Sequence, residues 1–278
     1  MNELAAADAY CRTLTLRHYE NFTVASRFVP ADVRVDLMRF YGFCRTTDDL
    51  GDESGSTTKA LSRLERWKGE VQELFDGGAP VHPVLVALRQ TVARRRLDSK
   101  PFVDLIAANE QDQRVHSYEA WPELEAYCML SAAPVGRVVL RIFGVEDARA
   151  QGCSDDVCIG LQLANHAQDV SRDAVLGRSY LLEEDLRASG AQGAVKALVD
   201  RARTLLASGR TLEGMVAGAL RVQLALYRLG GLAICDAIAR DGYRTQVKRP
   251  SVSKGAKVAI LAKALIEGMQ RRHEVVSC

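Results

Sequence analysis

Apolar residues recur every three or four positions along almost the whole chain, and this spacing strongly limits what the chain can fold into. The pattern is clearest at Leu61, Leu64, Trp67, Val71 and Leu74, where it predicts one face of a helix. The same spacing runs through residues 84–92, 102–108, 124–143, 157–170, 195–206, 220–239 and 258–269. The alternating pattern of strands flanked by turn dipeptides is absent. The sequence therefore predicts an all-α fold, with one domain over residues 1–278 because no break is long enough to be a linker.

The composition is that of a globular protein and excludes several functional classes. Hydrophobic residues make up 47% and charged residues 26% of the 278 residues, so a large core needs no metal or disulfide support. The 37 Lys and Arg against 35 Asp and Glu argue against a nucleic-acid-binding protein, which usually carries a basic excess. The seven cysteines are odd in number and form no CxxC pair. We expect reduced thiols in a cytoplasmic protein.

Membrane contact is expected to be peripheral at most, at the inner membrane face. The N-terminus lacks the basic and apolar regions of a signal peptide, and the longest uncharged apolar stretches, 126–136 and 157–168, are shorter than a membrane span. Residues 240–278 carry nine Lys and Arg against three Asp and Glu. This basic segment fits contact with anionic lipid or an anionic substrate, and it fits a solvated helix end equally well.

The first polar cluster lies at residues 45–53, at the end of an apolar helical run. Asp48 and Asp52 are one turn apart and share a face, with Arg45 one turn before Asp48 and Tyr41 one turn before Arg45. All four residues are therefore predicted to lie on one stripe of the helix. Taken alone, the cluster fits a solvated helix end as well as a binding site.

The second polar cluster favours a binding site. Asn165, Asp169 and Asp173 follow an i, i+4, i+8 pattern and continue directly from the largely apolar residues 159–164. Carboxylates one turn apart repel each other and are costly on a core-facing stripe unless they are ligated. A hard divalent cation fits them, because Mg²⁺ usually takes one or two carboxylates together with water and phosphate oxygens. Two such helices facing each other would hold Mg²⁺, or Mn²⁺ as the alternative ion, on a diphosphate.

Both clusters and their surroundings resemble the squalene/phytoene synthase family of trans-isoprenyl diphosphate synthases. The family carries DxxxD after a Tyr…Arg stripe and NxxxDxxxD in a later helix, which here are Asp48…Asp52 and Asn165…Asp169…Asp173. Residues 21–30, 127–136, 168–173 and 177–181 resemble its hydroxysqualene-forming subgroup. The resemblance implies a single-domain helical bundle with a central cavity. There are two departures: His166-Ala167 replaces an aromatic pair, and Leu182 replaces a proline.

The resemblance also implies an activity. The expected enzyme is a carbon–oxygen lyase that converts presqualene diphosphate and water to hydroxysqualene and diphosphate through a carbocation, in bacterial squalene and hopanoid biosynthesis. Mg²⁺ is the implied cofactor. NADPH is not expected, and the GxGxxG fingerprint is absent. The implied partners are the isoprenoid diphosphate substrate and neighbouring enzymes of the squalene pathway, which would take over the product.

The site residues carried over from the family fall into three overlapping groups. The implied metal ligands are Asp48, Asp52, Asn165, Asp169 and Asp173. The implied catalytic residues are Tyr41, Asp48, Asp52 and Asp169. The implied substrate-binding residues are Arg45, Tyr127, Gln162, Asn165, Arg178 and Tyr243. Phe22 and Phe40 are expected to line the hydrocarbon tunnel or to pack in the core, and His166 has no assigned role.

Two alternatives stay open. The same aspartates could serve a transferase that joins two farnesyl diphosphates head to head, giving presqualene diphosphate or a phytoene-type or dehydrosqualene product. Such an enzyme places two diphosphates and should use more basic contacts, so Gln168, where the family usually has Arg, favours the single-diphosphate reaction. The other alternative is a non-catalytic scaffold protein, which would be expected to have lost a motif carboxylate. This chain has lost none.

Overall fold

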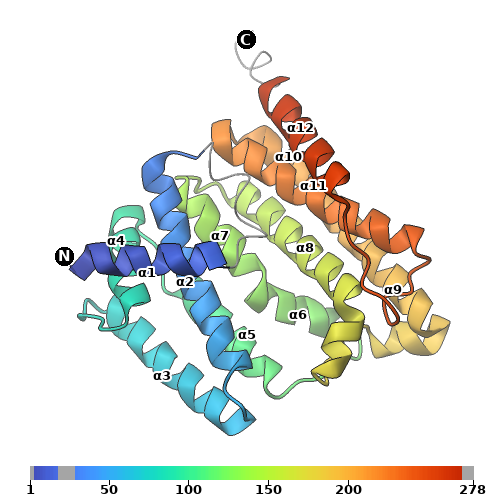
Figure 1. The fold of residues 1–278 in the computed structure, drawn as a ribbon, viewed down its shortest axis with the longest axis horizontal. Coiled ribbons are helices and arrows are strands. Elements are labelled where there is room, and N and C mark those ends of the chain that lie inside the picture. The colour runs from blue at the N-terminus through green and yellow to red at the C-terminus, as the bar shows by residue number, and fades with distance from the viewer. Residues whose placement is uncertain (1–2, 18–28, 271–278) are drawn as a thin grey trace. The chain divides into compact units, whose positions relative to one another are not determined.

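The computed structural model describes residues 3–17 and 29–270, and these residues fold into helices (Figure 1). The helices are α1 (Glu3–Arg17), α2 (Ala31–Asp52), α3 (Thr57–Phe75), α4 (Pro83–Arg95), α5 (Lys100–Asp112), α6 (Trp121–Ser131), α7 (Ala133–Ile142), α8 (Ala148–Val175), α9 (Glu183–Ala207), α10 (Gly209–Met215), α11 (Gly218–Arg240) and α12 (Lys254–Gln270). In this part of the chain, β structure is limited to one isolated bridge between Tyr118 and Leu182. The predicted all-α fold class is confirmed. Phe22 lies outside the described residues.

The helices pack into two compact units. Unit 1 comprises residues 1–114 and 134–146 and contains α1 to α5 and α7 from Pro134 onward. Unit 2 comprises residues 115–133 and 147–278 and contains α6 and α8 to α12. The first motif lies in unit 1 and the second in unit 2, and the expectation of one domain over residues 1–278 stays a prediction.

Unit 1 is organised around α2, which contacts α1, α3, α4 and α5. Phe40 and Phe43 of α2 are buried, and the ring centroid of Phe43 lies 5.0 Å from that of Phe102 in α5 and 5.9 Å from that of Trp67 in α3. The indole N–H of Trp67 donates to Thr47 Oγ1 at 2.9 Å. Phe40 is therefore a core residue, and each such buried aromatic side chain stabilises the fold by roughly 1.5–3 kcal/mol. This core fixes the end of α2 that carries the first motif.

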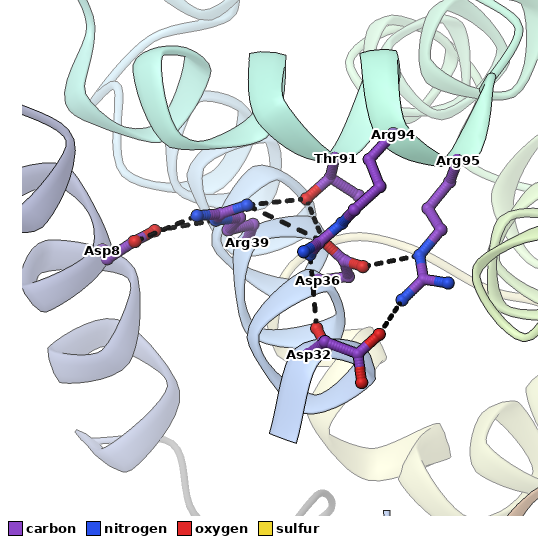
Figure 2. A network of polar contacts seen from close by, with 7 residues as sticks. All are labelled: Asp8, Asp32, Asp36, Arg39, Thr91, Arg94 and Arg95. Carbon is purple, nitrogen blue, oxygen red and sulfur yellow. Dashed lines mark hydrogen bonds and ion pairs between the residues drawn. The ribbon is translucent and has the colours of Figure 1, made fainter. Parts of the chain in front are cut away.

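A buried carboxylate connects α2 to α4 (Figure 2). Asp36 of α2 has no exposed surface. It accepts a hydrogen bond from Thr91 Oγ1 at 2.6 Å, and it pairs with Arg95 at 2.7 Å and with Arg94. A buried charge is tolerated only when it is paired and hydrogen-bonded. All three partners come from one face of α4, so the single charge of Asp36 orients that helix on α2.

The same network continues to α1 (Figure 2). Arg39 follows Asp36 by three residues on α2 and is also buried. Its guanidinium donates to both carboxylate oxygens of Asp8 in α1, at 2.7 and 2.9 Å, and lies 3.7 Å from Asp36. At the exposed end of the network, Asp32 pairs with Arg95 at 2.7 Å. Three helices of unit 1 are thus joined through the polar face of α2.

Unit 2 is built on α8, which packs against α9, α10 and α11. The helix begins at Asp147, whose carboxylate accepts the N–H of Ala150 at 2.8 Å as an N-cap. At Gly160 the neighbouring helix comes so close that an added Cβ would lie 3.0 Å from the carbonyl oxygen of Ala202. The helix ends before Gly177, which has a φ of 71° and permits the left-handed turn. The second motif occupies the last turns of this helix.

Among the described residues, one helix, α11, is long and apolar enough to cross a membrane when judged by length and composition alone. Half of its most apolar window is buried within the protein, and core helices pass the same test. It also carries Arg228, which is buried and pairs with Glu213 of α10 at 2.6 Å and with Glu267 of α12 at 2.8 Å. These contacts identify α11 as a packed helix of unit 2.

The cysteines of the described residues are free thiols, as predicted. Burial raises the pKa of Cys11 and of Cys128 to about 12. Thiols with such pKa values are poor nucleophiles and weak metal ligands. Cys11 and Cys128 are therefore packing residues, one in each unit.

Replacing Asp36 with Asn should destabilise the protein by about 3 to 5 kcal/mol, because it leaves Arg39 and the α4 arginines without their central charge. The matched control is Asp32→Asn, which removes an exposed carboxylate from the same helix and the same network. Urea denaturation followed by circular dichroism should show a large shift in midpoint for Asp36→Asn alone. Equal midpoints for the two variants would show that the buried charge does not hold the helices together.

Candidate active site

The first motif occupies the last three turns of α2, in unit 1. Tyr41, Arg45, Asp48 and Asp52 follow one another along the helix as predicted. Burial raises the pKa of the half-buried Tyr41 phenol. The guanidinium of Arg45 does not pair with Asp48, however. It forms an ion pair with Asp49 and lies 3.6 Å from the carboxylate of Glu53.

The hydrogen bond that Asp48 accepts comes instead from a side-chain amide. Asn109 of α5 donates to Asp48 Oδ1 over 3.4 Å. The two helices approach closely here, since a Cβ on Gly51 would lie 2.9 Å from Asn109 Oδ1. The surrounding protein, and then the negative charge of Asp52, raise the pKa of Asp48 to about 7, while Asn109 opposes the rise. Asp48 is itself exposed to solvent, and water therefore screens part of the interaction that raises its pKa.

The second motif lies on α8, in unit 2. Asn165 is exposed, and Asp169 and Asp173 are half-buried at successive turns of the same stripe. Arg178 follows in the turn after α8, where its backbone N–H donates to the carbonyl of Asp173 at 2.9 Å. Four of the predicted site residues thus follow one another along the last turns of α8 and the turn after it.

Asp169 is bound by an arginine that the sequence did not single out. Arg249, in the loop between α11 and α12, donates to both oxygens of the Asp169 carboxylate, one of them at 3.1 Å. The same guanidinium donates to Gln168 Oε1 at 2.8 Å, and the amide of Gln168 donates to the carbonyl of Pro250 at 2.7 Å. Arg172 lies further away, at 3.7 Å from Asp169. A planar guanidinium suits such a bidentate pairing better than an ammonium group.

Four rings gather behind the second motif. Tyr127 of α6 lies between Tyr118 and Tyr180, with ring centroids 5.5 and 5.7 Å apart, and 6.3 Å from His166. His166 stacks on Tyr180 with centroids 3.6 Å apart. All four are buried. Of this aromatic cluster (Tyr118, Tyr127, His166 and Tyr180), only Tyr127 was predicted as a site residue.

His166, which stands where the family has an aromatic residue, also packs as an aromatic ring, because it stacks on Tyr180. It is buried, and its Nε2 has no hydrogen-bond partner in the structure. Burial lowers the pKa of His166 to about 3, so the ring is neutral at ordinary pH. Leu182, the second departure from the family pattern, is the N-cap residue of α9 and is buried. The replacement of proline by leucine therefore concerns the start of α9.

The remaining predicted residues lie in unit 2. Gln162 is half-buried on α8, one turn before His166. Tyr243 lies in the turn after α11 with a φ of 60°, a conformation that residues other than glycine rarely adopt. Its backbone N–H donates to the carbonyl of Ile238 at 3.0 Å. A role for Tyr243 in closing the pocket stays a prediction.

The donor atoms of the two motifs fit a magnesium ion. Within the described residues, no group of three His, Cys, Asp or Glu side chains is placed to hold a metal. Magnesium does not need such a cage, since it binds through one or two carboxylates and fills its other positions with water and phosphate oxygens. Asp48 and Asp52 supply two carboxylates one turn apart. Burial, and then the charge of Asp52, raise the pKa of Asp48, and a bound cation would favour the ionised form of both carboxylates. That both motifs share one site stays a prediction.

Comparison with known proteins identifies the family of the chain. The squalene/phytoene synthase family model matches residues 15–256. A hydroxysqualene synthase of Rhodopseudomonas palustris is 33% identical over 228 residues, which are 76% of this chain and 73% of that protein. A phytoene synthase of Arthrospira platensis is 32% identical over 195 residues, 65% of this chain, and this chain spans 63% of its length.

Two solved structures share the fold. The crystal structure of squalene synthase HpnC from Alicyclobacillus acidocaldarius matches with a TM-score of 0.81 and 43% identity, covering 87% of this chain and 97% of that one. A dehydrosqualene synthase matches with a TM-score of 0.84 at 21% identity, over 95% of this chain and 97% of its own; this second likeness concerns the fold alone. The chain therefore belongs to the squalene/phytoene synthase family and is an isoprenoid synthase of the squalene/phytoene type.

Proposed function

We propose that this enzyme converts presqualene diphosphate and water to hydroxysqualene and diphosphate, with Mg²⁺ as its cofactor. The observation that carries the proposal is the pair of acidic stripes, Asp48…Asp52 and Asn165…Asp169…Asp173, each presented on one helix with every carboxylate retained. The 33% identity to hydroxysqualene synthases of Rhodopseudomonas palustris and Sinorhizobium fredii supports this choice of reaction.

In the reaction, the carbon–oxygen bond to the diphosphate breaks and its electron pair leaves with the diphosphate. The carbocation rearranges, a water oxygen forms the new carbon–oxygen bond, and one water proton is released. Bound magnesium would supply Lewis acidity and neutralise the leaving group. Asp48, Asp52, Asn165, Asp169 and Asp173 would hold the metal.

The basic residues near the motifs are suited to bind the diphosphate. Arg249 already donates two hydrogen bonds to a carboxylate, Asp169, and the oxygens of a diphosphate accept from a guanidinium in the same way. Arg45 and Arg178 lie beside the first and second motifs respectively. We propose that Arg249 exchanges Asp169 for a diphosphate oxygen when metal and substrate bind.

The aromatic cluster is suited to the carbocation. Ring faces carry partial negative charge and attract a cation without forming a bond to it. Tyr118, Tyr127 and Tyr180 provide three such rings, and His166, stacked on Tyr180, adds a fourth, neutral one. Being buried, they also exclude bulk water, which would otherwise capture the cation at the wrong carbon.

The condensation of two farnesyl diphosphates remains the second candidate, and one observation favours it. Gln168 was expected to leave this site with one positive charge fewer than the family usually has. However, the guanidinium of Arg249 lies 2.8 Å from Oε1 of the Gln168 side chain. The basic group is thus supplied from another segment of the chain. The 32% identity to a phytoene synthase points the same way.

A product assay separates the two candidates. Purified enzyme with Mg²⁺ and without NADPH would be given presqualene diphosphate in one tube and farnesyl diphosphate in another, and the products identified by mass spectrometry. We expect hydroxysqualene from presqualene diphosphate and no C30 product from farnesyl diphosphate. Presqualene diphosphate or a C30 polyene from the second tube would identify the condensing enzyme.

Asp48→Asn and Asp169→Asn should each lower turnover by about a thousandfold, because each removes a charged metal ligand without changing the size of the side chain. Helical circular dichroism should be unchanged. The matched control is Asp200→Asn on α9, an exposed carboxylate paired with Lys196, which should keep full activity. Full activity in either motif variant would contradict the assignment of ligands.

Arg249→Gln should lower kcat/KM by about a hundredfold through the loss of a charged contact to the leaving group. Arg172→Gln, which removes an exposed arginine 3.7 Å from the same carboxylate, should change it by less than about threefold. Calorimetric titration with inorganic diphosphate and Mg²⁺ should show the same order of effects on affinity. Similar losses in both variants would mean that general positive charge, rather than the bidentate guanidinium, is what matters.

A further inference from the structure

The helix α12 has one face that packs against the protein. It lies along α11 (Figure 1). Ala264 is fully buried in a cluster with Ala225 and Leu229 of α11. One turn further on, a Cβ added to Gly268 would lie 2.6 Å from a side-chain carbon of Val222. These contacts define the inward face of α12 and leave the opposite face outside the core of unit 2.

The outward face of α12 is apolar as well. Val258, Ala262 and Ile266 follow one another at one-turn intervals along it, and all three are exposed. The exposed fraction is 66% for Val258 and 49% for Ile266. A helix that is apolar on both faces needs a second apolar surface to cover it, and contiguous exposed apolar residues mark interaction sites.

A groove continues this apolar face toward α11. It has a volume of about 520 Å³. Its apolar lining comes from α11, α12 and the loop between them, namely Ala233, Ala239, Val252, Ala256, Ala259 and Ile260. Ala259 is also exposed on α12, so the groove and the outward face form one surface. Of the two charged residues at the groove, Asp236 is paired with Arg203 at 2.7 Å.

The charges around this surface are basic. Lys254, Lys257 and Lys263 of α12 are exposed. The one acidic residue in the sequence of α12, Glu267, is held by the buried Arg228 at 2.8 Å. Residues 240–270 contain seven Lys and Arg against two Asp and Glu, a net charge of +5. The occupant of the apolar face should therefore be apolar with an anionic rim.

We propose that α12 docks on the surface of a membrane that contains anionic lipids. The stripe Val258–Ala262–Ile266 would enter the boundary between headgroups and acyl chains, and the lysines would contact lipid phosphates. A second copy of this chain fits less well, because it would bring the same lysines face to face. This proposal concerns a surface of unit 2 and does not depend on which reaction the enzyme catalyses.

The test is co-sedimentation of the full-length protein with vesicles, made either of phosphatidylcholine alone or of phosphatidylcholine mixed with phosphatidylglycerol. We expect binding to the anionic vesicles only, weakened by high salt. The double variant Val258→Ser, Ile266→Ser should bind about tenfold more weakly or worse. Each of Lys257→Gln and Lys263→Gln should weaken binding by about fivefold.

The matched control is Val81→Ser, which replaces a valine that is 89% exposed in unit 1 and should leave binding unchanged. Circular dichroism would establish that every variant is folded. Absence of binding to anionic vesicles, or equal binding by the wild type and the α12 double variant, would overturn the proposal. So would a dimer in sedimentation velocity that the double variant abolishes, because a second copy would then cover this face.

Discussion

A carboxylate on a helix face needs a positive partner to offset its charge. Much of this structure depends on which group supplies that positive charge to each carboxylate. Within α2, Asp36 and Asp48 lie three turns apart on the same helix. Asp36 is fully buried and is met by Arg94, Arg95 and Thr91. Asp48 receives an amide hydrogen bond over 3.4 Å, and its pKa rises to about 7. The charge of Asp36 is compensated by the fold, whereas the raised pKa of Asp48 means that a bound cation would be needed to favour its charged form fully.

In the second motif, an arginine from a distant segment of the chain supplies the positive partner. Asp169 is neutralised by Arg249, which is 80 residues away in the chain. This pairing keeps α8 stable in the absence of a ligand, since two motif carboxylates one turn apart would otherwise repel each other. In the proposed reaction the same guanidinium would be available to the diphosphate. Arg249 thus pairs with a motif carboxylate in the ligand-free protein, and we propose that the same guanidinium binds the substrate.

The sequence allowed prediction of the parts that depend on local spacing. The 3.6-residue periodicity predicted the helical class, and Leu64, Trp67, Val71 and Leu74 are buried as that pattern requires. The i, i+4 relations placed Asp48 with Asp52 and Asn165 with Asp169 and Asp173, because helix geometry alone fixes them.

Partners that are distant in the chain were beyond the reach of such patterns. Asn109 meets Asp48 across 61 residues, and nothing in its own surroundings distinguishes it from any other asparagine on a helix. Arg249 is one of nine basic residues in 240–278, for which contact with anionic lipid, contact with an anionic substrate and a solvated helix end all stayed open. The apolar run 124–143 was predicted as one helical stretch, whereas Pro134, which cannot donate a backbone hydrogen bond, separates α6 from α7. For Asn109 and Arg249, tertiary packing decided what local spacing left open.

The loop between α11 and α12 connects the site to the proposed membrane surface. It begins at the end of α11, holds Arg249 against Asp169 through Gln168 and Pro250, and ends where α12 begins with Lys254. A helix held at a lipid surface loses freedom at its first turn, and only four residues separate that turn from Arg249. Docking of α12 would therefore restrict the positions that Arg249 can reach, so that membrane contact and binding of the diphosphate act on the same short segment. Because Arg249 lies between Asp169 and the first turn of α12, such a coupling would need no other part of the chain to move.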